Sequence, residues 1–276
     1  MSFGQRLLRT FADHGNLCVG IDPHSSLLEQ WGLAASASGV REFGLRVVEA
    51  AAGRVGIVKP QVAFFEAYGS AGLAALEDVL AAARGARLLV IGDAKRGDIG
   101  STMEGYASAW LRVDSPLRVD AVTVSPYLGI DSLAPTRAAA DASNTGLFVL
   151  AATSNPEAGS LQSVRTPSGS SIAATIVETV KNWNAGEALG STGVVIGATV
   201  DLDAYGIDPS SLVGTPVLAP GFGHQGAEFS DVRRLFGDAA DTVLLSASRS
   251  ILSAGSSGIA DAIERQVADV HEALAR

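Results

Sequence analysis

The sequence predicts a single (β/α)₈ TIM barrel, and three observations favour this fold. The chain has 276 residues, close to the roughly 250 residues typical of such a barrel. Eight short apolar runs follow one another along it, and stretches with helical periodicity separate them. Each run ends on polar or turn-forming residues, as buried parallel strands do. We therefore expect one barrel domain spanning residues 1–276. A doubly wound open sheet is the structural alternative, because periodicity does not show whether a sheet closes.

The expected strands and helices can be placed along the chain. The strands are LCVGID (17–22), VGIVKP (55–60), RLLVIGDAK (87–95), AVTVSP (121–126), LFVLAAT (147–153), VVIGAT (194–199), PVLAPG (216–221) and TVLLSAS (242–248). Alanine-rich stretches between them are amphipathic, and in residues 70–86 Leu73, Leu76 and Leu80 recur at helical spacing. Residues 154–171, the longest stretch rich in Gly, Pro and Ser, are expected to form an exposed loop after the fifth strand.

Composition and charge narrow the class of protein. A net charge of −9 opposes non-specific binding to nucleic acid, which depends on Lys and Arg contacts with phosphate groups. Cys18 is the only cysteine, so we expect neither an internal disulfide nor a cysteine-based metal site. The first residues lack the apolar core of a signal peptide, and no apolar run approaches the about 18 residues that span a bilayer. We therefore expect a soluble, cytoplasmic protein with no membrane partner.

Polar residues interrupt the apolar strands at the same predicted end. The segment GDAKRGDIGS (92–101) places two carboxylates and two cations directly after an apolar run. The residues at or just past the C-terminal ends of predicted strands are Asp22, Lys59, Asp93, Lys95, Ser154, Pro220 and Arg249. Barrel enzymes build their active sites at this face. Independent solvated turns would not require this coincidence, so the pattern indicates a functional cluster.

The spacing of the charges indicates how they can meet. Asp93 and Lys95 are two residues apart on a strand, so both side chains point to the same side of the sheet. Asp98 lies beyond the strand, where the turn can bring it back to the barrel mouth or send it across to a partner chain. Lys59 on an adjacent strand supplies a second cation. Burying such a cluster is costly unless its charges alternate and are hydrogen-bonded, and that cost favours a functional role.

The last two strands carry the features of a phosphate site. The segments LAPGFGHQGAEFSD (218–231) and LLSASRSIL (244–252) include the loops after strands seven and eight, where such barrels commonly bind phosphate. Small residues let backbone N–H groups approach an anion, and Arg249 can offer a bidentate pair of donors.

Together these motifs resemble the orotidine 5'-phosphate decarboxylase family, and more closely its longer bacterial branch. The resemblance covers nearly the whole chain and rests on GIDP (20–23), VKPQVAFFE (58–66), GDAKRGDIGST (92–102), SPYLGIDSL (125–133), ATSNP (152–156), APGFGHQG (219–226) and ASRSIL (247–252). The pattern Asp-x-Lys-x-x-Asp alone is shared with sister decarboxylases and aldolases, but the ensemble is much more specific. The longer connections 154–171 and 181–192 depart from the compact members of the family.

The resemblance implies a role for each matched residue. Lys59, Asp93, Lys95 and Asp98 look like the family's alternating charged tetrad. Asp98 and the adjacent Ile99 would reach into the site of the neighbouring subunit, so the implied functional unit is a homodimer. The remaining implied substrate contacts are Thr102 at the same shared boundary, Asp22 at the ribose, Ser154 at the pyrimidine ring, Pro220 at the start of a lid over residues 220–230, and Gln225 and Arg249 at the phosphate.

The implied reaction is the cofactor-independent decarboxylation of orotidine 5'-monophosphate to UMP and CO₂, the last step of de novo pyrimidine biosynthesis. Nothing in the pattern requires a metal or another cofactor. Lys95 would stabilise the negative charge that develops at ring carbon C6 and protonate it, because a fixed ammonium favours the transition state over the ground state. Lys59 and Asp93 would orient Lys95, and Asp93 and Asp98 would lie near the departing carboxylate.

Three alternatives share parts of the pattern. A magnesium-dependent sugar-phosphate decarboxylase or aldolase has the same charged motif, but DIGST (98–102) and ATSNP (152–156) favour the orotidine branch. A Schiff-base aldolase that uses Lys59 or Lys95 is opposed by the flanking carboxylates, which keep a lysine protonated. A barrel that binds its ligand without catalysis is opposed by the intact tetrad.

Overall fold

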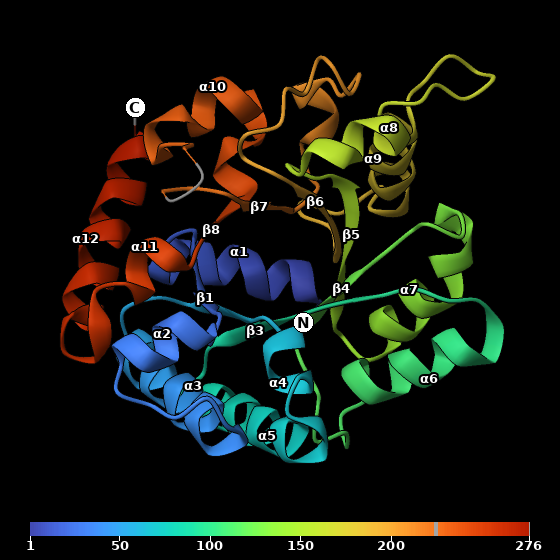
Figure 1. The fold of residues 1–276 in the computed structure, drawn as a ribbon. Helices are drawn as coiled ribbons and strands as arrows, with labels where there is room; N and C mark the ends of the chain where they lie inside the picture. The colour runs from blue at the N-terminus through green and yellow to red at the C-terminus, as the bar shows by residue number, and fades with distance from the viewer. Residues whose placement is uncertain (224–225, 276) are drawn as a thin grey trace.

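Eight parallel strands close into a barrel in chain order, as predicted (Figure 1). The computed structural model describes residues 1–223 and 226–275. The strands are β1 (Leu17–Ile21), β2 (Ile57–Pro60), β3 (Leu89–Arg96), β4 (Ala121–Val124), β5 (Gly146–Ala152), β6 (Thr192–Ile196), β7 (Val217–Pro220) and β8 (Val243–Ala247). Because β8 pairs with β1, the sheet has closed and the open-sheet alternative is wrong.

The strands overlap every expected run, although some of their ends differ. β6 begins at Thr192, two residues before the expected start, and ends at Ile196 instead of continuing to Thr199. It ends there because the backbone turns: the N–H group of Val200 donates to the carbonyl oxygen of Gly197 at 3.0 Å. The apolar run VVIGAT therefore includes a turn that its hydropathy does not reveal.

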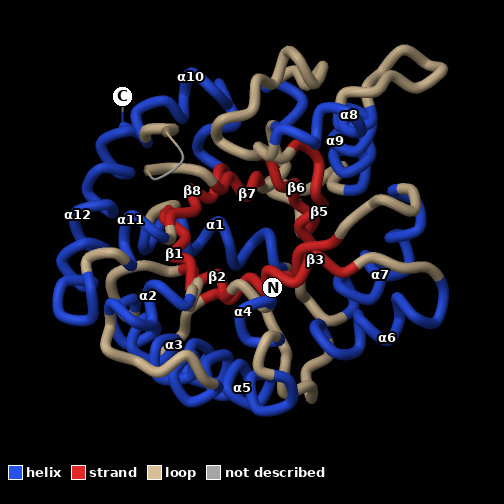
Figure 2. The backbone as a smooth tube through the Cα atoms, viewed as in Figure 1, coloured by secondary structure: helices blue, strands red, loops and turns tan. Residues whose placement is uncertain are grey.

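Helices surround the ring of strands (Figure 2). The helices are α1 (Phe3–His14), α2 (Ser25–Gln30), α3 (Ala37–Ala51), α4 (Ala63–Glu66), α5 (Gly69–Gly85), α6 (Gly100–Leu111), α7 (Ala134–Ala142), α8 (Gly159–Gln162), α9 (Ile172–Trp183), α10 (Val232–Phe236), α11 (Arg249–Leu252) and α12 (Gly255–Ala275). Short 3₁₀ turns are η1 (Ile130–Leu133), η2 (Pro156–Ala158), η3 (Pro209–Leu212), η4 (Phe229–Asp231) and η5 (Gly237–Thr242). The amphipathic segment predicted at residues 70–86 forms α5.

Helix α1 lies across the opening of the strand ring and closes one end of the barrel (Figures 1 and 2). Its Phe3 ring packs edge-on against Phe148 of β5, with ring centroids 6.1 Å apart. The backbone N–H of Gly4 donates to Ser191 Oγ, immediately before β6, at 3.2 Å. These contacts lie at the N-terminal ends of the strands, so α1 leaves the C-terminal ends accessible.

The core has two layers because alternate residues of each strand point to opposite faces of the sheet. Side chains inside the barrel include Cys18, Ile57, Ile91, Phe148, Leu218 and Leu244, which pack with Phe3 and Leu7 of α1. Side chains between the sheet and the outer helices include Val19, Val58, Val90, Val194 and Leu245. Burial on both faces explains why the strands are continuously apolar up to their C-terminal ends.

The expectation of one exposed loop over residues 154–171 is wrong in part. The segment contains η2 and α8, and Ala158 within it is buried. Its last residue, Ser171, is also buried, and its Oγ accepts a hydrogen bond from the N–H of Ala174 at 2.9 Å as the N-cap of α9. Composition did not reveal these features, because Gly, Pro and Ser are also common at the ends of short helices.

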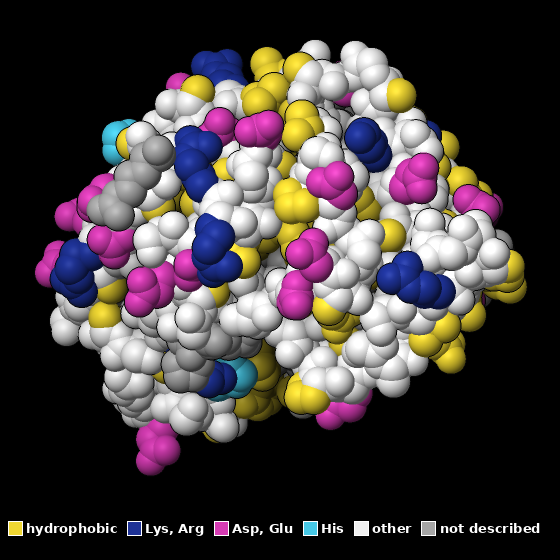
Figure 3. All heavy atoms as spheres, turned by 90° about the horizontal axis from the view of Figure 1, so that it is seen from above, with side chains coloured by type: hydrophobic (Ala, Val, Ile, Leu, Met, Phe, Trp, Pro, Cys, Tyr) yellow, Lys and Arg dark blue, Asp and Glu magenta, His cyan; other side chains and the backbone are white. Residues whose placement is uncertain are grey.

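Charges of both signs are distributed over the surface. On the face shown in Figure 3, acidic and basic side chains are interspersed, in keeping with the net charge of −9. Among the described helices, none is long and apolar enough to cross a bilayer.

Substitutions in α1 test whether it stabilises the barrel. Leu7 is fully buried in the barrel interior, whereas the adjacent Leu8 is 37% exposed. We expect Leu7→Ala to lower the free energy of unfolding by about 2–5 kcal/mol, because it removes buried methyl groups and leaves a cavity. The matched control, Leu8→Ala, should cost less than about 1 kcal/mol. Urea denaturation measures both, and equal losses would contradict the buried position of Leu7.

Candidate active site

A cleft of about 510 Å³ opens at the C-terminal ends of the strands. Seven predicted site residues line it: Asp22, Lys59, Asp93, Lys95, Ser154, Pro220 and Arg249. They come from β2, β3 and β7 and from the residues that follow β1, β5 and β8. A barrel with consecutive parallel strands brings these ends to one rim, so residues far apart in sequence share one cleft.

Three of these residues form a row of alternating charge. Lys59 Nζ lies 3.0 Å from Asp93 Oδ2, and Lys95 Nζ lies 2.6 Å from Asp93 Oδ1. The side chains of Lys59 and Asp93 are only 6% and 10% exposed, whereas that of Lys95 is 45% exposed. Asp93 is therefore held between an inner, buried ammonium and an outer one that can meet a ligand.

The two buried members of this row stabilise each other's charged forms. Burial alone would lower the pKa of Lys59, but the Asp93 and Asp22 carboxylates outweigh burial and hold that pKa well above its usual range. Burial alone would raise the pKa of Asp93, but Lys59 and Lys95 outweigh it and hold the pKa well below its usual range. Lys59 and Asp93 consequently stay ionised across the neutral pH range.

The end of β3 is irregular where it presents these charges. Gly92 pairs with Val122 and Arg96 with Val124, so the register with β4 shifts between them. Within this shift Lys95 has a φ of +50°, in the left-handed region. Asp93 and Lys95 do meet on the cleft side, but through a distorted strand end and not the regular alternation that the sequence predicts.

At the cleft, Asp22 places a carboxylate oxygen without a hydrogen-bond donor from the described part of the chain. Its Oδ1 atom is buried and has no hydrogen-bond partner among the described residues. A buried carboxylate oxygen without a donor is costly, and it lies in the lining of the cleft. A hydroxyl group of a bound molecule would satisfy it.

The segment after β3 lies outside its own cleft. Asp98 is half-buried, and its Oδ1 accepts a hydrogen bond from the N–H of Ile99 at 2.8 Å. Ile99 is 60% exposed and Thr102, in the first turn of α6, is also exposed. None of the three lines the cleft that contains Lys95. Gln225, which the resemblance places at the phosphate, lies outside the described residues.

Several residues in the cleft were not predicted. They include His24, Gln61, Thr123, Gln162, Ser246 and Ser248. Thr123 is the only polar residue in the strand AVTV, and a lone hydroxyl in an apolar strand was the signal that could have revealed it. Its Oγ1 donates to Asp93 Oδ1 and accepts from the backbone N–H of Lys95, both at 2.9 Å. Thr123 is therefore hydrogen-bonded to the central carboxylate of the charged row.

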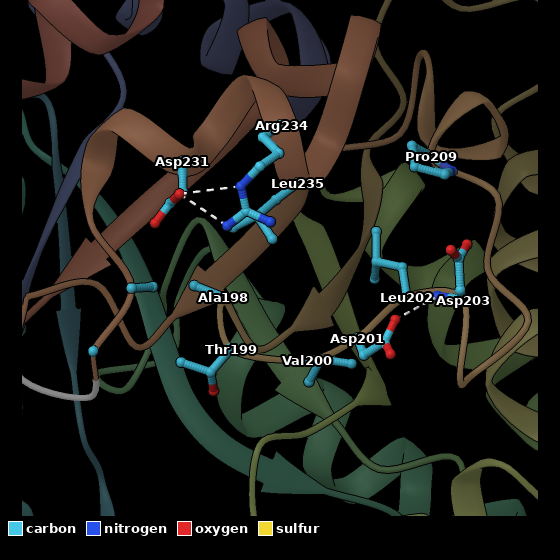
Figure 4. Close-up of a pocket in the computed structure, with 12 residues that line it drawn as sticks. Ala198, Thr199, Val200, Asp201, Leu202, Asp203, Pro209, Asp231, Arg234 and Leu235 are labelled. Atoms are coloured by element: carbon cyan, nitrogen blue, oxygen red, sulfur yellow. Dashed lines mark hydrogen bonds and ion pairs between the residues drawn. The ribbon is translucent and has the colours of Figure 1, made fainter.

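A second depression, of about 440 Å³, lies outside the barrel mouth (Figure 4). It is formed by residues 198–203 after β6 and by the α10 region, where Arg234 pairs with Asp231 at 2.8 Å. None of the predicted site residues that the structure describes lines it. The cleft at the strand ends is therefore the one that matches the chemistry read from the sequence.

The pair Lys59–Asp93 makes stability depend on pH. Because the pKa of Asp93 is lowered in the folded state, its charge stabilises the fold fully above the pKa of an unfolded Asp, about 3.9. This stabilisation is lost as the pH falls through the pKa of Asp93 in the folded state. A raised Lys59 pKa stabilises the fold below about 10.4 and loses this effect as pH rises through the folded pKa. We expect Asp93→Asn to cost about 3–5 kcal/mol between about pH 5 and 9, since it leaves a buried charge unpaired.

Chemical denaturation at several pH values measures this cost. The matched control is Asp114→Asn, which removes the carboxylate of the exposed pair Arg112–Asp114, whose side chains are 61% and 70% exposed. That variant should match the wild type. A loss at Asp93 that stays constant down to pH 1 would show that charge is not its cause.

Comparison with known proteins identifies the family. Residues 15–262 match the family model described as "Orotidine 5'-phosphate decarboxylase / HUMPS family". Relatives named orotidine 5'-phosphate decarboxylase include one from Salinispora tropica, 49% identical over 99% of this chain and 98% of its own, and one from Streptomyces coelicolor, 51% identical over 92% and 90%. The structure of Leishmania donovani OMP decarboxylase superposes with a TM-score of 0.78 at 29% identity, covering 100% of both chains. The chain belongs to the orotidine 5'-phosphate decarboxylase family.

Proposed function

We propose that this cleft removes CO₂ from orotidine 5'-monophosphate to give UMP, without a metal or another cofactor, as the last step of de novo pyrimidine biosynthesis. The observation that carries the proposal is the row Lys59–Asp93–Lys95 at the rim of a barrel of this family. One barrel domain over residues 1–276 contains the machinery. Its proposed compartment is the cytoplasm, in keeping with the lone, buried thiol of Cys18.

Lys95 performs the central step in this proposal. The bond between ring carbon C6 and the carboxylate breaks, CO₂ leaves, and the electron pair stays on C6. The ammonium group of Lys95 stabilises this charge and donates a proton to C6. Asp93 remains a carboxylate because Lys59 neutralises it from the buried side, so it holds Lys95 in place at 2.6 Å without needing to take its proton.

The other lining residues bind the rest of the nucleotide. Asp22, with its unpaired Oδ1, accepts a hydrogen bond from a ribose hydroxyl. Ser154 after β5 meets the pyrimidine ring. Arg249 at the start of α11 binds the phosphate together with Gln225, and Pro220 at the end of β7 begins the lid over the phosphate. Binding energy from the phosphate then supports positioning at the ring.

The functional unit is a homodimer in which Asp98 and Ile99 of one subunit act at the cleft of the other, with Thr102 at the same boundary. Two observations support it. These three residues lie outside their own cleft, as described above. An exposed apolar groove of about 500 Å³ around Tyr127 and Leu128, which are 76% and 53% exposed, adjoins the cleft through Leu150 and Gln162, which line both. An apolar surface of this kind favours association.

A decarboxylation assay in EDTA tests the reaction. The ultraviolet absorbance of the orotate chromophore should fall with wild-type protein, and Lys95→Ala should lower kcat at least about a thousandfold, because it removes the proton donor and the fixed charge. Lys181→Ala, at the exposed third lysine of the chain, should retain wild-type activity. Activity that appears only with added Mg²⁺ would instead favour a sugar-phosphate decarboxylase or aldolase.

Subunit mixing tests the shared site. Lys95→Ala and Asp98→Ala should each be nearly inactive, but a mixed dimer contains one site with both native residues. Random exchange makes half of the dimers mixed, so activity should return to about one quarter of the wild-type value. Activity that stays at the level of the separate variants, although native mass spectrometry shows mixed dimers, would place Asp98 in the site of its own chain.

A further inference from the structure

The backbone of Lys95, whose ammonium group lines the cleft, adopts an unfavourable left-handed conformation. A side chain with a Cβ atom at φ +50° costs roughly 1–2 kcal/mol relative to the right-handed region. The register shift between Gly92 and Arg96 takes the intervening residues out of the regular ladder with β4. The N–H of Lys95 therefore needs a partner other than the backbone of β4.

Thr123 supplies that partner with its side chain. It lies on β4 between Val122 and Val124, the two residues that flank the shift, and it is 1% exposed. Its Oγ1 accepts the hydrogen bond from the N–H of Lys95 at 2.9 Å. The single proton of the same hydroxyl goes to Asp93 Oδ1, also at 2.9 Å. One hydroxyl thus donates to Asp93 and accepts from Lys95, two residues further along β3.

The two bonds hold Lys95 directly at its backbone and, through Asp93, at its ammonium group. Asp93 Oδ1, which Thr123 binds, is also the atom that holds Lys95 Nζ at 2.6 Å. The backbone N–H of Lys95 is held by the hydroxyl of Thr123 itself. A closed ring of contacts therefore runs from the Lys95 backbone through Thr123 and Asp93 to the Lys95 ammonium group.

We propose that Thr123 is a positioning residue that keeps Lys95 in its left-handed conformation and sets the place of its ammonium group. The role in turnover rests on the proposed function, whereas the role in conformation does not. The two hydrogen bonds of the Thr123 hydroxyl restrict Lys95 far more than packing alone would. Valine has nearly the same shape and volume as threonine but makes neither hydrogen bond, so it isolates their effect. Its contribution should appear in the chemical step, where the position of the charge matters, and not in nucleotide binding.

Three variants separate this role from simple packing. Thr123→Val removes the hydroxyl and should lower kcat about ten- to a hundredfold, with KM for orotidine 5'-monophosphate and the Kd of UMP unchanged. Thr123→Ser keeps the hydroxyl and should restore most of the rate. Thr145→Val is the matched control, since Thr145 is equally buried and its Oγ1 bonds to the Ala140 carbonyl oxygen at 3.3 Å, away from the cleft. It should keep the wild-type kcat.

The crystal structure of Thr123→Val gives a readout that does not require turnover. We expect Lys95 to leave the left-handed region or its Nζ to move away from Asp93. An unchanged Lys95 overturns the proposal whether or not the wild type is active, and an inactive wild type would separately refute the proposed reaction. In an active enzyme, an unchanged kcat in Thr123→Val, or equal losses in the valine and serine variants, also overturns it. If the valine variant does not fold, Thr123→Ala is compared with Thr123→Ser, because these two variants both lack the methyl group and differ only in the hydroxyl.

Discussion

The arrangement of the cleft depends on the carboxylate of Asp93, which lies between two ammonium groups. Without it, Lys59 would be a buried cation with no close counter-charge, and Lys95 would lose the contact that holds its head group. The attraction outweighs burial for both Lys59 and Asp93, as the opposite directions of their pKa shifts indicate. The site therefore has a fixed electrostatic field before any ligand enters, which is the condition for stabilising charge in a transition state.

The barrel can bury the Lys59–Asp93 pair because packing and charge lie at opposite ends of the strands. At the N-terminal end, α1 seals the interior with Phe3 and Leu7, and the strands there are apolar on both faces. Toward the C-terminal end the same strands carry Lys59 and Asp93. A packed interior resists collapse around the charges, so the ion pair keeps its geometry instead of relaxing toward solvent.

The sequence was sufficient to predict the strands and most of the cleft, because consecutive parallel strands place all their C-terminal ends at one rim. Strand periodicity also predicted that Asp93 and Lys95 lie on one side of the sheet, which they do, although through a distorted strand end. It could not reveal the left-handed turn at Lys95 or the part of Thr123 in it, since a register shift depends on the pairing with β4 and not on hydropathy. The short helix α8 was missed for a similar reason, because its residues also suit a loop.

The path of the chain after β3 bears on the proposed dimer, because it determines where Asp98 lies. Gly97 passes so close to β4 that an added Cβ atom would lie 2.5 Å from the carbonyl oxygen of Ser125. The following residues do not line the cleft, and Gly100 at φ +54° begins α6. Asp98 therefore lies outside the cleft of its own chain, where Lys95 pairs with the single carboxylate of Asp93 among the described residues. In the proposed dimer, a second subunit would place its own Asp98 beside Lys95 and so continue the alternation of charge that Lys59 and Asp93 begin.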